Sequence, residues 1–391
     1  MKKRIESIDL LRAIAMIVMA LDHIRDYFHA DYFYFDPTDL TKTNIPLFFT
    51  RWITHFCAPV FVFLAGTSAF LVGQKKSKKE LSAFLFKRGL WLLFLEITVI
   101  GFAWSFNPSM HMIRLQVIWA LGICMICMSA IIYLPGNVIL IGALAILFGH
   151  NLLDNIHATG NTFKDFLWAE LHQRKRFTAG PYTIATGYPI LPWLAIMALG
   201  YCFGNFYKGS FDPSKRKKYL LILGTSATLL FILLRSINNY GDMAPWSAQR
   251  SFGLTLCSFL NVTKYPPSLM YTLMTLGPAI IFLALSERQL GFIGKIIIPV
   301  GRVPLFFYIL HLYLLHLLAV ILVVISGRPW TEMIAIKNIS ATDSPWLKGY
   351  GLSLAGVYGV WILVIIILYP LCRKYDQYKS KHKEKWWLSY L

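Results

Sequence analysis

Apolar stretches of about 20 residues recur along the whole chain and constrain its fold more than any other feature. Such a stretch is long enough to cross a ~30 Å hydrocarbon core as a helix. The composition agrees, because 57% of the 391 residues are hydrophobic and only 15% are charged. The sequence therefore predicts an all-α, polytopic integral membrane protein with about ten transmembrane helices, at residues 8–29, 52–73, 89–106, 115–134, 137–153, 186–206, 219–236, 267–285, 300–326 and 348–371.

The distribution of basic residues predicts the orientation. Cytoplasmic loops carry an excess of lysine and arginine, and an even number of spans places both termini on the cytoplasmic side. More than half of the 38 lysines and arginines then fall in the cytoplasmic segments, which are 1–7, 74–88, 207–218, 286–299 and 372–391. We attribute the net charge of +19 to this topology and to anionic lipid at the cytoplasmic face, not to a nucleic-acid partner.

No linker, low-complexity segment or soluble domain is visible. We expect a single transmembrane domain, with a helical bundle over 1–371 and a basic cytoplasmic tail over 372–391. The larger connections, 30–51, 154–185, 237–266 and 327–347, all fall on the outer side. A partner or substrate is therefore expected there.

The first apolar run has a basic residue near its start and a histidine near its end. Arg12 and His23 are eleven residues apart, which places them ~16 Å apart along a helix and within ~20° of the same face. Charges within a span cost a few kcal/mol each and are usually functional. The alternative is that Arg12 extends to the interface and the polar cluster is the hydrated outer end of the helix.

Acidic residues flank this histidine. Asp26 lies within side-chain reach of His23, and Asp22, Asp26 and His29 form a second stripe on the helix. A carboxylate beside an imidazole fixes its tautomer and raises its basicity, as in a general base. A basic group and a reactive histidine separated in this way suit a coenzyme A thioester, whose phosphates match the planar donors of arginine.

The sequence "RIESIDLLRAIAMIVMALDH" resembles the first helix of the heparan-alpha-glucosaminide N-acetyltransferase-like family. It also resembles transmembrane acyltransferases that modify bacterial surface sugars, in which an arginine, ten residues and a histidine are the hallmark. Similar motifs follow in order over nearly the whole chain: "HFCAPVFVFLAGTSAF", "KRGLWLLFLE", "YPILPWLAIMALGYCFG", "TKYPPSLMYTLMTLGP" and "GRVPLFFYILHLYLLH".

The resemblance implies transfer of an acyl group, expected to be acetyl, across a bacterial cytoplasmic membrane. The donor would be cytoplasmic acyl-CoA (acetyl-CoA), and the acceptor a hydroxyl or amine of an extracytoplasmic saccharide. Arg12 and His23 match the surface-sugar group and would bind the donor and act as the base. In the heparan enzyme an asparagine occupies the position of His23, so His29 and His55 are alternative bases.

Further polar residues lie in or beside predicted spans. Arg302 opens a helix at "GRVP", where a break would expose backbone N–H groups to phosphate. We assign Arg302 and Arg88 to the donor site with Arg12. Glu96, inside the third span, is also assigned to the donor site; pairing with Arg12 or Arg302 and a purely structural role both remain open.

On the acceptor side, Lys264 and Tyr265 in "TKYPPS" contact a sugar or anchor the span. His311 and His316 lie ~140° apart on one helix, so one of them would face a cavity, and we assign His311 to the substrate. No Cys, His and acidic set has metal-ligand spacing, so no metal is expected.

Two other functions remain open on the sequence. A transporter would use the same intramembrane charges to line a pathway, and a structural membrane protein would keep the fold without activity. Lipid is an expected partner, and the sequence is compatible with a homo-oligomer without defining one.

Overall fold

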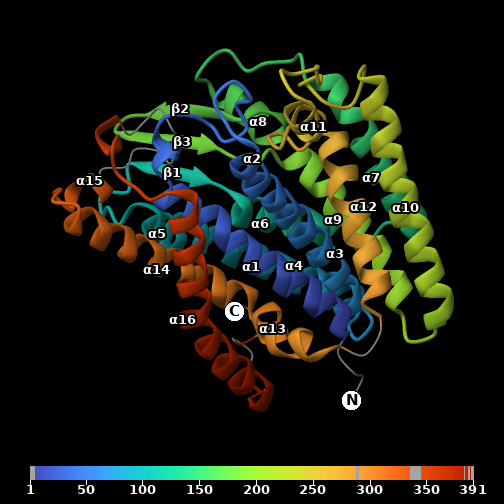
Figure 1. Ribbon diagram of the computed structural model, residues 1–391. Coiled ribbons are helices and arrows are strands. Elements are labelled where there is room, and N and C mark those ends of the chain that lie inside the picture. The colour runs from blue at the N-terminus through green and yellow to red at the C-terminus, as the bar shows by residue number, and fades with distance from the viewer. Residues whose placement is uncertain (1–4, 288–289, 335–344, 383, 386–387, 389–391) are drawn as a thin grey trace.

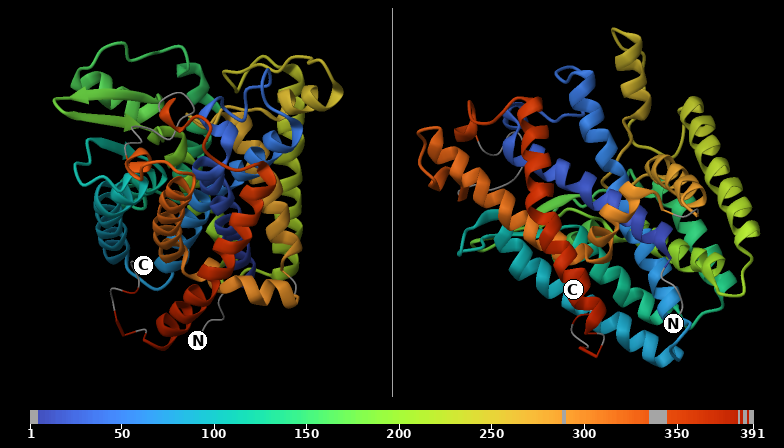
Figure 2. Two further views of the ribbon diagram at one scale, coloured as in Figure 1. Left: turned by 60° about the vertical axis from the view of Figure 1, so that its left-hand side comes forward. Right: turned by 60° about the horizontal axis from the view of Figure 1, so that its bottom comes forward.

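The computed structural model describes residues 5–287, 290–334, 345–382, 384–385 and 388, and it is 72% helical with little sheet. Most helices run between two ends of the molecule (Figure 1). One end has a small sheet, and both termini lie at the other end (Figure 2). The predicted helical class is confirmed, with a sheet added.

The helices and strands follow one another with short connections. The helices are α1 Glu6–Phe28, α2 Ile45–Trp52, α3 Cys57–Gly73, α4 Lys78–Leu95, α5 Gly101–Ser105, α6 Val117–Ile131, α7 Gly136–Gly149, α8 Phe163–His172, α9 Ile190–Phe203, α10 Pro213–Ile237, α11 Phe252–Leu260, α12 Leu269–Leu285, α13 Phe292–Arg302, α14 Pro304–Ile325, α15 Thr331–Ile334 and α16 Leu354–Lys381. The strands are β1 Met112–Leu115, β2 Lys175–Ala179 and β3 Tyr182–Thr186.

Every apolar range predicted as a span contains a helix. Among the described residues, six helical stretches are long and apolar enough to cross a membrane: Ile45–Gly73, Gly136–Leu153, Ile190–Tyr207, Pro213–Ile237, Pro304–Ile325 and Leu354–Lys381. Helices α6 and α12 are apolar but shorter, with 15 and 17 residues, and α1 contains several charged residues. The chain is an integral membrane protein; about ten spans and their orientation stay predictions.

Several helices begin at a residue whose side chain caps the first turn. Ser77 and Glu80 form a capping box at the start of α4, in which each side chain accepts a hydrogen bond from the other's backbone N–H. Asp212 caps α10 just before Pro213, whose missing N–H is tolerated in the first turn. Ser268 and Ser353 cap α12 and α16 in the same way. These caps fix where the chain enters the bundle.

A three-stranded sheet was not predicted. Strand β3 lies between the other two, parallel to β1 and antiparallel to β2. Gly180, with φ of +58°, supplies the left-handed conformation in the turn between β2 and β3. Together with α8, this hairpin replaces the loop expected over 154–185 and covers one end of the bundle (Figure 2).

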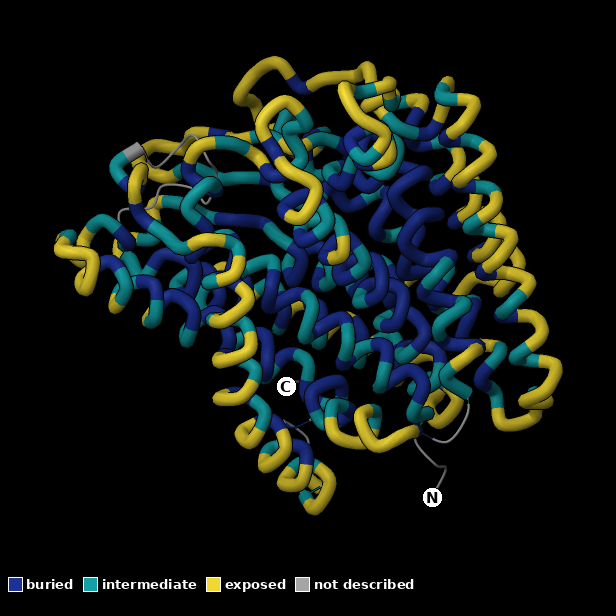
Figure 3. The backbone as a smooth tube through the Cα atoms, viewed as in Figure 1, coloured by how far each residue is buried: buried dark blue, intermediate teal, exposed yellow. Residues whose placement is uncertain are grey.

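Helix α1 packs against α3, α13, α14 and α16, so its polar residues are shielded from lipid. Buried residues concentrate in the centre of the bundle, whereas α10 and α16 are exposed along much of their length (Figure 3). Helices α3 and α9 approach backbone to backbone. A Cβ at Gly66 would lie 2.0 Å from the Met197 carbonyl oxygen, and one at Gly200 would lie 2.0 Å from that of Phe63. Small residues at such crossings are typical of membrane helices.

Candidate active site

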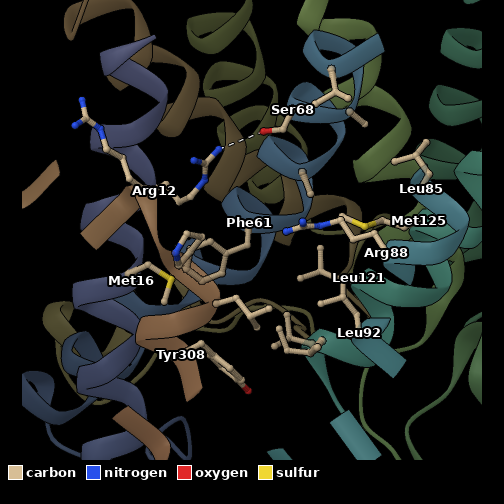
Figure 4. Close-up of a pocket in the computed structure, with 18 of the residues that line it drawn as sticks. Arg12, Met16, Phe61, Ser68, Leu85, Arg88, Leu92, Leu121, Met125 and Tyr308 are labelled. Carbon is tan, nitrogen blue, oxygen red and sulfur yellow. Dashed lines mark hydrogen bonds between the residues drawn. The ribbon is translucent and has the colours of Figure 1, made fainter. Parts of the chain in front are cut away.

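A cavity of about 430 Å³ lies between α1, α3, α4, α6 and α14. Most of its wall is apolar, and its basic residues are Arg12, Arg88, Arg302 and Lys379. In Figure 4, Arg12 and Arg88 reach toward the same space from α1 and α4, and Tyr308 lies at the far side. We call this the inner cavity, because its arginines lie toward the end of the molecule that holds both termini.

Asp9 orients two of the inner-cavity arginines. Arg12 Nη1 donates to Asp9 Oδ1 at 3.1 Å and to the Gly301 carbonyl at 3.2 Å. Its Nη2 donates to Ser68 Oγ at 3.3 Å, as Figure 4 shows. Arg302 Nε lies 3.4 Å from Asp9 Oδ2. These contacts hold the positive charges at the cavity wall, where an anionic group could meet them.

A second cavity, of about 200 Å³, lies beneath the sheet and is called the outer cavity. Its wall is mainly polar, with cationic, anionic and aromatic side chains. The cations are Arg25, Arg51, Arg114, Arg174 and Lys264, and the acidic residues are Asp22, Asp26 and Asp36. Tyr188 and Tyr265 belong to the same wall, and their hydroxyl oxygens are 3.3 Å apart. Such a surface suits a polar ligand.

Ion pairs organise the charges of the outer cavity. Arg51 Nη1 donates to both carboxylate oxygens of Asp22, at 3.1 and 2.9 Å. Arg25 Nη2 lies 2.9 Å from Asp22 Oδ1 and 2.6 Å from Asp26 Oδ1. At the rim, burial opposes ionisation of Asp36, but hydrogen bonds from the N–H and hydroxyl of Thr38 lower the pKa of that carboxyl below its usual value.

His23 pairs with a histidine from a different helix. His23 Nδ1 lies 2.7 Å from His311 Nε2, and His311 Nδ1 lies 3.1 Å from the Phe307 carbonyl oxygen. Since a carbonyl only accepts, His311 carries its proton on Nδ1 and accepts on Nε2. His23 therefore donates from Nδ1, which leaves a lone pair on its Nε2. This is the tautomer that a general base requires.

Residues that line the two cavities are neighbours near this pair. His23 and Trp104 line the outer cavity, whereas Tyr308 lines the inner one. The His23 ring centre lies 5.0 Å from that of Trp104 and 6.1 Å from that of Tyr308. Arg12 lines the inner cavity and His23 lines the outer one, although both lie on one face of α1. This agrees with the separation of ~16 Å along the helix that their sequence spacing predicts.

Several sequence-assigned residues lie elsewhere. His29 and His55 are buried, and among the described residues neither lines the inner or the outer cavity. His55 Nδ1 instead lies 3.1 Å from the Trp52 carbonyl. Glu96 accepts from the Gln116 N–H at 2.9 Å, so its partner is neither of the arginines suggested by the sequence.

Most of the remaining assigned residues line one of the two cavities, and His311 lines neither of them. Arg12, Arg88 and Arg302 line the inner cavity, whereas Lys264 and Tyr265 line the outer cavity. His311, assigned to the substrate, lies behind His23 and is fully buried. His316 binds the Ala103 carbonyl, with its Nδ1 at 2.8 Å.

The outer-cavity arginines Arg51, Arg114 and Arg174 are among the residues that the sequence did not single out. Asp22 and Asp26, which the sequence placed as orienting groups for His23, bind Arg51 and Arg25 instead. Nothing local in the sequence marks Arg114 or Arg174, because a strand and a connection unrecognised in the sequence bring them to the cavity.

These features define a helical membrane protein with two cavities, one of them lined by His23, which pairs with the buried His311. The family model described as heparan-alpha-glucosaminide N-acetyltransferase, catalytic, matches residues 4–236, which is more than half of the chain, and the chain belongs to this family. This membership makes it a transferase of the acetyltransferase type. No curated protein matches the chain. His311 and Tyr308 lie beyond the matched residues.

Proposed function

We propose that the protein transfers an acyl group, acetyl in the first instance, from cytoplasmic acyl-CoA to a hydroxyl or amine of a saccharide on the other side of a bacterial cytoplasmic membrane. The proposal is supported chiefly by one observation. His23 lines a cavity with polar and aromatic groups, and its ring centre lies 6.1 Å from that of Tyr308, which lines the cavity with arginines. Its tautomer leaves Nε2 free to accept a proton.

The inner cavity suits the donor. Arg12, Arg88 and Arg302 offer donors to the phosphates of CoA. The apolar wall beyond them suits the thin pantetheine arm, and the ~16 Å between Arg12 and His23 along α1 gives that arm its path. The thioester would then lie beside Tyr308 and His23. This assignment places the inner cavity on the cytoplasmic side.

The outer cavity suits the acceptor. Saccharides bind through hydrogen bonds from charged side chains and through contact of their C–H faces with aromatic rings. Lys264 and Arg174 offer hydrogen-bond donors, and their charged groups lie 5.2 and 5.1 Å from the centre of the Tyr265 ring. Trp104 and Tyr188 add aromatic rings to the same wall. The proposed acceptor site is thus next to His23 on the side away from the donor.

The reaction follows from these positions. His23 Nε2 removes the proton from the acceptor hydroxyl or amine as its oxygen or nitrogen attacks the thioester carbonyl carbon. His311 accepts a hydrogen bond from His23 Nδ1 throughout, which holds the ring in place as it becomes an imidazolium. The C–S bond then breaks, and the departing CoA sulfur takes the proton from His23 Nε2. A histidine that first accepts the acyl group itself is the alternative route.

The test separates the two ends of α1. Arg12→Ala should weaken acetyl-CoA binding by about 1.5–3 kcal/mol, the value of a charge-assisted hydrogen bond. His23→Ala should leave that binding nearly intact and cut turnover on the order of 10²–10⁴-fold. Acetyl-CoA affinity and acetyl transfer are measured for each variant in nanodiscs, with Lys78→Ala, at an exposed site in the same half of the molecule, as the control.

The result can also redirect the proposal. Full loss of transfer in His29→Ala or His55→Ala, with His23→Ala active, would move the base to that residue. Unchanged activity in all three variants would rule out histidine catalysis.

A transporter is the second candidate, because two cavities whose lining residues are neighbours near titratable side chains also resemble a pathway. Vesicles decide between the two functions. Saccharide flux without acetyl-CoA, together with a thermal stability that acetyl-CoA does not change, would favour transport. Acetylated product with no flux favours the transferase.

A further inference from the structure

A cluster of histidine and aspartate side chains lies apart from both cavities, at the end of the molecule that holds the sheet. His150 and Asp154 follow α7, and His172 ends α8. His150 Nδ1 lies 3.1 Å from His172 Nε2, which lies 3.8 Å from Asp154 Oδ1. One potential ligand atom from each residue lies within 4.8 Å of the other two. Within the described chain, no member of this cluster lines the inner or outer cavity.

The spacing of these atoms fits a small tetrahedral cation. Zinc binds histidine nitrogen and aspartate oxygen at about 2.0–2.2 Å, so neighbouring ligand atoms lie about 3.3 Å apart. The measured distances of 3.1 and 3.8 Å bracket that value. His150 begins a short 3-10 helix, Asp154 directly follows it, and their potential ligand atoms lie within 4.8 Å of each other. Residue type and geometry therefore agree.

The polar atoms around the cluster are incompletely satisfied without a cation. In the described part of the chain, Asp154 Oδ1 is buried and has no hydrogen-bond partner. The facing nitrogens of His150 and His172 can share only one proton. The other oxygen, Asp154 Oδ2, accepts from Asn151 Nδ2 at 2.8 Å. Such outer hydrogen bonds commonly orient the ligands of a metal.

We propose that His150, Asp154 and His172 bind a divalent transition metal of the zinc type, with water at the fourth position. This departs from the sequence-based expectation of no metal, which rested on ligand spacing along the chain. The third ligand lies 18 residues after Asp154, and only the folding of α8 against the bundle brings it into reach.

The metal would tie α8 and the strand that follows to the end of α7. Arg174, two residues after His172, reaches the outer cavity, where its guanidinium lies 5.1 Å from the Tyr265 ring centre. Fixing His172 therefore fixes the point from which Arg174 enters the cavity. The metal site itself does not depend on the proposed acetyl transfer; only this consequence for the acceptor does.

The test is zinc binding to the full chain in detergent, after treatment with a chelator and its removal. Isothermal titration with ZnCl₂ should show one site per chain, and zinc should raise the thermal unfolding temperature. Asp154→Asn and His172→Gln keep the size of the side chain and should weaken zinc binding at least about tenfold. His157→Gln, at an exposed histidine in the same loop, should bind zinc like the parent.

Co²⁺ provides a readout of coordination that does not depend on stability. The parent chain with Co²⁺ should show the strong visible absorption of a tetrahedral site, and His172→Gln should lose it. Absence of a stoichiometric site in the folded parent overturns the proposal. Equal zinc affinity in the parent and Asp154→Asn, or an equal loss in His157→Gln, also overturns it, because the binding would then belong to other groups.

Discussion

The histidine pair shows how a half-buried base can be oriented by a buried imidazole in place of a carboxylate. His311 is fully buried on α14 and presents a neutral acceptor to His23 from a fixed backbone contact. A neutral imidazole loses less solvation on burial than a carboxylate does. It also stabilises the imidazolium less than a carboxylate would.

The first prediction concerns His311. His311→Ala removes the acceptor for His23 Nδ1, a hydrogen bond whose loss at a buried site costs about 1–3 kcal/mol. We expect kcat to fall roughly 5–150-fold with little change in acetyl-CoA affinity. His311→Gln, whose amide oxygen can accept the same hydrogen bond, should restore part of kcat. A variant that loses acetyl-CoA binding while keeping kcat would contradict an orienting role.

A second residue-scale prediction concerns Arg25, which is buried between Asp22 and Asp26. Arg25→Leu removes a buried cation from two half-buried carboxylates, and breaking a buried pair costs about 3–5 kcal/mol, an upper bound for these partly exposed partners. We expect a large fall in the thermal unfolding temperature of the purified protein. Arg250→Leu, at an exposed arginine, is the control. Equal unfolding temperatures for the two variants would show that Arg25 contributes little to the fold.

At the scale of helices and strands, the apolar pattern was informative and the polar segments were not. Length and hydropathy located a helix in each of the ten predicted ranges, because the membrane requires long apolar segments, but they did not locate α2, α8, α11 or α15. The strands β1, β2 and β3 are short and lie outside the apolar runs, so no periodic pattern marked them. The sequence could place Arg12 and His23 on one face of a helix, but it could not show that His311, almost 290 residues away, holds His23.

Contacts between residues far apart in the chain also explain why Asp22 pairs with Arg51, a partner that the sequence did not predict. Asp22 and Asp26 are near His23 along α1, and proximity in sequence favoured them as its partners. Arg51 comes from α2 and competes for Asp22. Whether Asp22 binds His23 or Arg51 depends on how α1 and α2 pack, and no local sequence pattern encodes that packing.

The element-scale prediction concerns the crossing of α3 and α9. Gly200→Ala places a Cβ where only 2.0 Å separates it from the Phe63 carbonyl oxygen, so the helices must move apart. Overpacking of this kind costs about 1–3 kcal/mol. Gly142→Ala, on the exposed face of α7 with no atom within 4 Å of the new Cβ, should be neutral or stabilising. Thermal unfolding of both variants in one detergent tests this, and equal stability would contradict the close approach.

At the scale of the whole molecule, the two ends differ in chemistry. Both termini lie at one end and the sheet lies at the other (Figure 2). The inner cavity includes Arg12 near the start of α1, whereas the outer cavity includes Arg114 of β1. The proposed metal cluster follows α7 and ends α8. A protein that moves a group from one compartment to a ligand in another needs such a difference. Its direction depends on which end faces the cytoplasm.

The last prediction fixes that direction. Basic residues favour the cytoplasm for the segments around Ser77 and Ser214, and both serines are exposed. Ser77→Cys and Ser214→Cys should therefore resist a membrane-impermeant thiol reagent in intact cells and react after permeabilisation. Lys164→Cys, exposed on α8, should react in intact cells, and the parent chain with its six cysteines gives the background. Reversed labelling would place the inner cavity outside the cell, where acyl-CoA is not supplied, and would overturn its assignment to the donor.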